Sequence, residues 1–200
     1  MGTVVLSVIG GAVCLLAVLI IVWLASCYNR LVRQRNQVDA AWAQIDVQLK
    51  RRYDLIPNLV ETVRGYAAHE RGTLDAVIQA RNSAVNAAGT PPANRAMAEN
   101  ALTQTLGRLF ALAEAYPNLQ ANQNFLGLQS ELANTEDKIA YARQFYNTNV
   151  LSYNTKTQTF PSVIFANMFG FQPAEFFEAE EAAREDVHVS FTPTPPAATP

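Results

Sequence analysis

The chain has few of the side chains that build metal sites, disulfide frameworks or nucleic-acid-binding surfaces. Its 200 residues include two cysteines and two histidines, and only 16% are charged, with a formal net charge of -2. Cys14 and Cys27 both lie in or beside an apolar run near the N-terminus, so they predict neither a disulfide framework nor a zinc ligand set. The small net charge excludes the strongly basic surface typical of nucleic-acid-binding proteins.

Motifs of catalysis are missing as well. The pair His69-Glu70 lacks the second histidine, four residues on, that a zinc-binding helix needs. The sequence contains no nucleophile elbow and no glycine-rich phosphate loop. We therefore expect a protein that is not an enzyme and that has no catalytic residue, no metal and no cofactor.

An uncharged run, VVLSVIGGAVCLLAVLIIVWLA, occupies residues 4–25. A helix of this length crosses a hydrocarbon core about 30 Å thick, and Trp23 and Tyr28 stand where an interfacial aromatic belt is expected. No Lys or Arg precedes the run, and it is longer than the apolar part of a cleavable signal peptide. These features favour a retained transmembrane anchor over residues 1–27.

Charge next to the anchor predicts its orientation. Arg30, Arg33 and Arg35 directly follow it, so by the positive-inside rule the body is cytoplasmic, with the N-terminus outside the inner (plasma) membrane. An alternative comes from LASC, residues 24–27, which resembles a lipobox. In that case Cys27 would be lipidated and the body would lie outside the cytoplasm.

Apolar residues then recur at helical spacing, at Leu31, Val38, Trp42, Ile45 and Leu49. No Gly or Pro lies between Ala12 and Pro57, so this first helix should continue from the membrane helix without a break. Pro57 has no N–H and Asp54 is a good N-cap, which together predict that the first helix ends here and a second begins. A kinked continuous helix is the alternative, because the apolar stripe stays in phase across the proline.

Three further amphipathic segments follow, one up to about residue 88, one over about 94–116 and one ending near 153. No stretch shows sustained alternation of period two, so no sheet is expected. Four such helices with short connections predict an all-α fold. We expect an N-terminal transmembrane helix followed by an elongated antiparallel four-helix bundle over residues 28–159, whose fourth helix returns toward the membrane.

A segment rich in Phe and Met, residues 160–182, comes after the bundle. It is expected to fold over the base of the bundle and complete its core. The alternative is an amphipathic wedge at the membrane interface, formed by Phe165, Met168, Phe169 and Phe171. The remaining residues, 183–200, are acidic and then rich in Pro and Thr, which predicts a disordered tail.

Two polar sets invite a functional interpretation. Lys50, Arg51 and Arg52 would lie at the membrane-distal tip of the first helix, either as a solvated helix end or as a partner-docking patch. Amide side chains crowd the beginning and the end of the fourth helix. Asparagine in caps and turns explains those at the beginning, but it explains those at the end, such as Asn147 and Asn154, less well.

Three stretches of the sequence resemble the LemA family, in the same order and over most of the chain after the anchor. They are YNRLVRQRNQVDAAWAQIDVQLKRRYDLIPNLVETVRGYAAHE, YPNLQANQNFLGLQSELANTEDKIAYARQFYN and FPSVIFANMFGFQPAEFFEA. The resemblance implies a membrane segment followed by a helical bundle, and it transfers no catalytic residue. It also implies a place near bacterial membrane proteases or, for one branch, in magnetosome membrane formation.

Two functions are therefore expected, each with the lipid bilayer as a partner. In the first, the protein is an adaptor or scaffold for other membrane proteins, a membrane protease among them by analogy with the family. In the second, it is a membrane-shaping envelope scaffold that forms homo-oligomers on lipid.

Overall fold

The computed structural model describes residues 1–177, without the side chains of residues 3–8, and shows only helices and connecting segments there. The all-α prediction is confirmed. The predicted disordered tail and the end of the Phe-rich segment lie outside the described residues. The helices are α1 (Gly2–Arg64), α2 (Arg71–Asn86), α3 (Pro92–Ala113), α4 (Pro117–Gln120), α5 (Gln123–Gln158) and α6 (Ser162–Met168).

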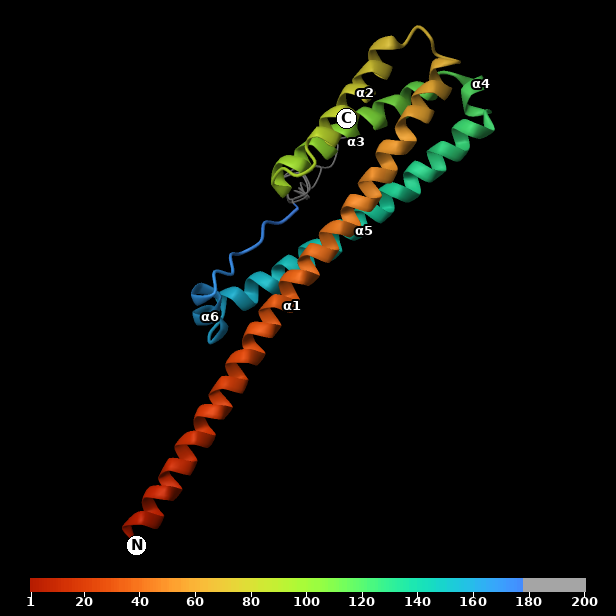
Figure 1. Cartoon of the computed structure of the whole chain (residues 1–200). Helices are drawn as coiled ribbons and strands as arrows, with labels where there is room; N and C mark the ends of the chain where they lie inside the picture. Colours follow the sequence, from red (N-terminus) through yellow and green to blue (C-terminus); the bar gives the residue numbers. More distant parts are fainter. Residues whose placement is uncertain (178–200) are drawn as a thin grey trace, which may run out of the picture.

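The 63-residue helix α1 is the axis of the molecule, and α5, α2 and α6 pack directly against it beyond its N-terminal part (Figure 1). Its N-terminal part stands free, and its apolar side chains, such as Leu16, Leu19 and Ile21, are exposed. This stretch is long and apolar enough to cross a membrane. The prediction that membrane segment and first bundle helix form one uninterrupted helix is confirmed.

The predicted break at Pro57 is wrong, because α1 continues through the proline to Arg64. Pro57 has no N–H to donate to the carbonyl of Tyr53, four residues back, which loses its partner within the helix. The side chain of Arg81, on α2, supplies the missing donor, with 2.9 Å from its Nε to Tyr53 O. Asp54 is not an N-cap but a residue of the helix interior, paired with Lys50 at 3.3 Å.

The first turn of the bundle therefore lies later than predicted, at residues 65–70, and α2 is shorter than expected. Gly65, the C-cap of α1, has low helix propensity and stands where the helix ends. The predicted third and fourth helices correspond to α3 and α5.

The predicted antiparallel bundle is confirmed, with α1 packed on α5, α2 on α3 and α1 on α2 (Figure 1). The core stripe of α1 includes Ile45, Leu49, Ile56 and Val63, each fully buried. The pair α2 and α3 covers only the membrane-distal part of α1. Nearer the anchor, the core is closed by α6 and by residues 171–177, which we call the strap.

The strap begins after Gly170, whose φ of +72° requires glycine at the turn that leaves α6. It then runs from α6 toward the beginning of α3 (Figure 1). Phe177 packs on Trp42, with 5.6 Å between ring centroids, and Trp42 also lies under the guanidinium of Arg95, on α3. The strap thus continues the core where α3 begins.

If Arg81 stabilises the helix by satisfying the carbonyl that Pro57 leaves unpaired, the two residues must be energetically coupled. We expect Arg81→Met to lower the free energy of unfolding by roughly 1–3 kcal/mol. In the Pro57→Ala background, where an N–H is restored, the same change should cost at least about 1 kcal/mol less. Urea unfolding of the full chain in detergent, followed by circular dichroism, measures both values.

Arg108→Met, at an exposed position of α3, is the matched control and should cost the same in both backgrounds. Equal costs of Arg81→Met in the two backgrounds would show that Arg81 does not replace the missing donor.

Candidate functional site

The end of the bundle next to the apolar stretch of α1 is built from aromatic contacts between α1 and the α6 region. Trp23 meets Phe165 edge-on at 5.5 Å between ring centroids, and Tyr28 meets Phe169 at 5.0 Å and Phe171 at 5.8 Å. These contacts hold α6 against the end of the apolar part of α1. Offset and edge-on aromatic pairs of this kind contribute about 0.5–1.5 kcal/mol each beyond their buried area.

The four residues predicted as a membrane interface divide into two pairs. Phe165 and Phe171 are buried, each 8% exposed, which fits the expectation that the segment completes the core. Met168 and Phe169 are 63% and 54% exposed and are therefore free to contact lipid. The exposed pair borders an apolar hollow of about 470 Å³, which Ile21 and other residues of α1 also line.

Cys27, the predicted alternative lipidation site, lies on α1 between Trp23 and Leu31 and is partly buried against the core. It lines a second hollow at this end, beside Arg30 and Lys156. The helix runs through Cys27 without interruption.

The strap is held along α5 by two Tyr-Asn pairs one heptad apart. The Asn154 amide donates to Ala174 O at 2.9 Å and accepts from Ala174 N at 2.8 Å. Asn147 makes the same two bonds with Phe177, each 2.9 Å long. Each asparagine thus pairs with the strap backbone as a neighbouring strand would.

The preceding tyrosines repeat this pattern. Tyr153 donates to Gln172 O at 2.9 Å and Tyr146 to Glu175 O at 2.8 Å. Seven residues of helix rise about 10.5 Å, and three residues of extended chain span about 10 Å. The heptad spacing of the Tyr-Asn pairs on α5 therefore matches a three-residue step along the strap.

Burial raises the pKa of Tyr146 to about 12, and the nearby charge of Glu175 contributes to the shift. The hydroxyl is therefore protonated at neutral pH and can donate to the strap. The signal for these contacts is present in the sequence as the repeat YN…YN over residues 146–154, but its partner could not be recognised, because a strap backbone leaves no pattern of side chains.

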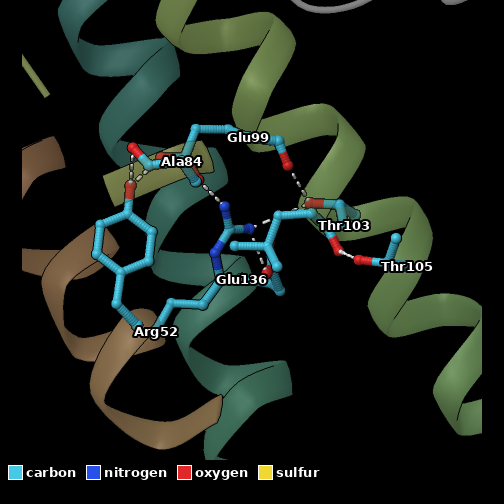
Figure 2. Close-up of polar contacts among 8 residues, drawn as sticks. Arg52, Ala84, Glu99, Thr103, Thr105 and Glu136 are labelled. Carbon is cyan, nitrogen blue, oxygen red and sulfur yellow. Dashed lines mark hydrogen bonds and ion pairs between the residues drawn. The ribbon is translucent and has the colours of Figure 1, made fainter. Parts of the chain in front are cut away.

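A buried charge network lies in the membrane-distal half, centred on Arg52 (Figure 2). The guanidinium forms ion pairs with Glu99 of α3 and, at 2.6 Å, with Glu136 of α5, and it donates to Thr103 at 3.1 Å. Arg52 is 1% exposed and Glu99 is 3% exposed. Removing one partner of such a buried pair costs about 3–5 kcal/mol, because the other charge is left unpaired.

Tyr53 completes the network by donating its hydroxyl to Glu99. Burial and this carboxylate raise the pKa of Tyr53 far above its usual value, so the hydroxyl stays protonated. The network joins α1, α3 and α5 at one level of the bundle.

The predicted position of the basic triad, Lys50, Arg51 and Arg52, is wrong. Because α1 continues to Arg64, these residues lie within the helix rather than at its tip. Arg52 is an internal residue and presents no charge to a partner. Arg51 pairs across the surface with Glu131 at 2.5 Å, and Lys50 pairs with Asp54, so only these two members of the triad lie on the surface.

The amides at the beginning of α5 act as expected of a helix start. Asn122 is the N-cap of α5 and accepts from Phe125 N at 3.0 Å. Its amide nitrogen also donates to the hydroxyl of Tyr66 at 2.8 Å, which ties this junction to the turn after α1. Within residues 1–177, no group of three or more His, Cys, Asp or Glu side chains is placed to hold a metal ion.

The model of the LemA family matches residues 41–191, a range that includes the charge network, both Tyr-Asn pairs and the strap. The chain belongs to the LemA family. It is 28% identical to the protein LemA of Metamycoplasma hominis over 164 residues, which cover 81% of this chain and 74% of the relative.

Magnetosome proteins are also similar to this LemA-family chain. The magnetosome protein MamQ 2 of Paramagnetospirillum magneticum is 27% identical over 179 residues, and MamQ of Magnetospirillum gryphiswaldense is 26% identical over the same length. Each alignment covers 78% of this chain but 66% of the relative, so the chain spans slightly less than two thirds of the MamQ proteins.

If the Tyr-Asn pairs hold the strap, removing both amides should release its backbone. We expect Asn147→Ala combined with Asn154→Ala to speed hydrogen exchange at the amides of Ala174 and Phe177 by roughly ten-fold or more, because each asparagine contributes two hydrogen bonds. Hydrogen exchange of the full chain, read by residue-resolved mass spectrometry, measures this.

The control is Asn149→Ala, because the Asn149 amide donates to Phe145 O of its own helix rather than to the strap backbone. Unchanged exchange at both strap amides in the double variant would mean that the tyrosine hydrogen bonds and the aromatic contacts hold the strap without the asparagines.

Proposed function

We propose that this LemA-family protein is a non-enzymatic, single-pass membrane scaffold that positions other membrane proteins. The observation that carries the proposal is the continuity of α1, which runs without a break from the membrane-competent stretch into the bundle core. A rigid connection of this kind fixes the height and direction of the bundle relative to the bilayer. An anchor that only tethers a soluble domain needs no such continuity.

A surface suited to partner binding lies on the two longest helices. Val47 of α1 and Tyr141 of α5 are 63% and 70% exposed, and both line a groove of about 560 Å³ between these helices. Exposed apolar residues gathered in a groove commonly mark a protein interface. Asp137 and Lys138 on the same groove provide polar contacts at its rim.

The bundle is placed in the cytoplasm in this proposal. Arg30, Arg33 and Arg35 follow the apolar stretch directly, and the positive-inside rule keeps such residues on the cytoplasmic side. The alternative, a lipoprotein joined to lipid at Cys27, would remove the apolar part of α1 and place the bundle outside. It would also sever the continuous helix on which the proposal rests.

A second function is favoured by Met168 and Phe169, which are exposed beside the apolar stretch of α1. Side chains of this kind insert into the headgroup boundary. A protein that inserts them and self-associates through the α1–α5 groove would shape the membrane rather than recruit a partner.

Topology is the first expected outcome of the proposal. A protease-cleavable tag at the C-terminus should be protected in intact cells and cleaved in inverted vesicles, and the peptide that contains Cys27 should have an unmodified mass. A tag cleaved in intact cells, together with a lipidated Cys27, would establish the lipoprotein alternative.

Partner binding is the second expected outcome. A photo-crosslinking residue at position 47 or 141 should give discrete adducts with another membrane protein in living cells. The matched control places the same residue at Gln129, which is exposed on α5 but does not line the groove. Adducts should be absent there and should disappear from position 141 when Val47→Ser is introduced.

Adducts only between copies of this chain would instead support the membrane-shaping function. Adducts of equal pattern at all three positions would show that the groove has no selectivity and would contradict the scaffold proposal.

A further inference from the structure

The second hollow at the membrane-facing end carries a charge arrangement that the fold does not require. It has a volume of about 290 Å³ and lies between α1, the end of α5 and the beginning of α6. Trp23, Cys27 and Arg30 line it from one side, and Lys156, Thr159 and Ser162 from the other. Two cations therefore share one small hollow.

Within residues 1–177, no carboxylate forms an ion pair with either cation, Arg30 or Lys156. Burial, and the positive charge of Arg30, lower the pKa of Lys156. The carbonyl end of α5 favours a cation in its last turn, which accounts for Lys156 but not for a second cation beside it.

The position of the hollow indicates which anion would enter it. Trp23 belongs to the end of the apolar stretch, so the hollow opens at the depth of the lipid headgroups when α1 spans a bilayer. Trp23 contacts Phe165, which lines the neighbouring apolar hollow of about 470 Å³ together with Ile21, Leu24 and Met168. The two hollows share no lining residue, and the contact between Trp23 and Phe165 lies between them.

We propose that the cationic hollow binds the headgroup of an anionic phospholipid, with the phosphate between Arg30 and Lys156 and the acyl chains along the apolar stretch of α1. The ligand comes from the bilayer that surrounds α1, so this inference rests on the membrane anchoring in the proposed function. Bound lipid would balance the two cations where the end of α5 and the beginning of α6 meet α1. It would add to the aromatic contacts that already hold α6 there.

The test uses Trp23 as a built-in reporter. The full chain with Trp42→Phe, which leaves Trp23 as its one tryptophan, is reconstituted in phosphatidylcholine vesicles. An equal fraction of the lipid is replaced by phosphatidylglycerol or phosphatidylcholine with brominated acyl chains, which quench tryptophan on contact. We expect stronger quenching by brominated phosphatidylglycerol, because its headgroup is anionic.

Variants without the two cations distinguish binding in the hollow from a general attraction of anionic lipid to the charged surface. Arg30→Gln with Lys156→Gln should lower the relative association constant for phosphatidylglycerol by roughly five-fold per charge, or about 25-fold. The control, Arg33→Gln with Arg35→Gln, also removes two positive charges, both from the stretch of α1 just after Arg30, but neither residue lines the hollow. It should keep most of the preference, and circular dichroism checks that all variants are folded.

Each other outcome is decisive. Equal quenching by the two lipids would be consistent with the membrane anchor but would overturn the headgroup site. An equal loss of the preference for phosphatidylglycerol in both double variants would also overturn the site, because the preference would then come from the overall surface charge. Absence of quenching by either lipid would place Trp23 outside the bilayer and would overturn the membrane anchoring as well.

Discussion

The unbroken backbone of α1 is the constraint on which the rest of the structure depends. A helix of 63 residues must retain its hydrogen bonds past Pro57, where one donor is missing. Arg81 supplies a donor to Tyr53 O from α2, so the packing of α2 and the continuity of α1 support each other. If the chain turned at Pro57 instead, Val60 and Val63 would leave the core stripe they share with Ile56.

The bundle is closed by different means along its length. In the membrane-distal half, α3 and α5 meet α1 around Arg52, whose charge is balanced by Glu99 and Glu136. Near the membrane, α3 is absent and the strap takes its place. Asn147 and Asn154 satisfy backbone groups of the strap that have no helix or sheet partner, which a core of apolar side chains could not do.

Local sequence patterns correctly predicted the features that depend on neighbouring residues. They failed where a residue far away in the sequence determines the structure. The apolar run and the helical period are local, and they correctly predicted the long apolar N-terminal helix and the bundle. Pro57 breaks helices in isolation, and only Arg81, 24 positions further on, reverses that expectation. Arg52 was predicted to be a surface charge because its partners, Glu99 and Glu136, are far away in the sequence. The Tyr-Asn repeat is present in the sequence, but nothing there indicates that it binds the backbone of the strap.

The strap connects the α6 end of the bundle to the core at the beginning of α3, two regions that are far apart in the sequence. The strap begins after α6, whose Phe165 contacts Trp23 at the end of the apolar stretch of α1. It ends on Trp42, which Arg95 links to α3. A change in the position of α6 would therefore act on the core of the bundle through the seven residues of the strap. Because α1 itself is continuous, such a change would alter the packing around α1 and leave its direction unchanged. In the proposed scaffold, the bundle would thus keep its distance from the membrane while lipid contact at α6 adjusts its surface.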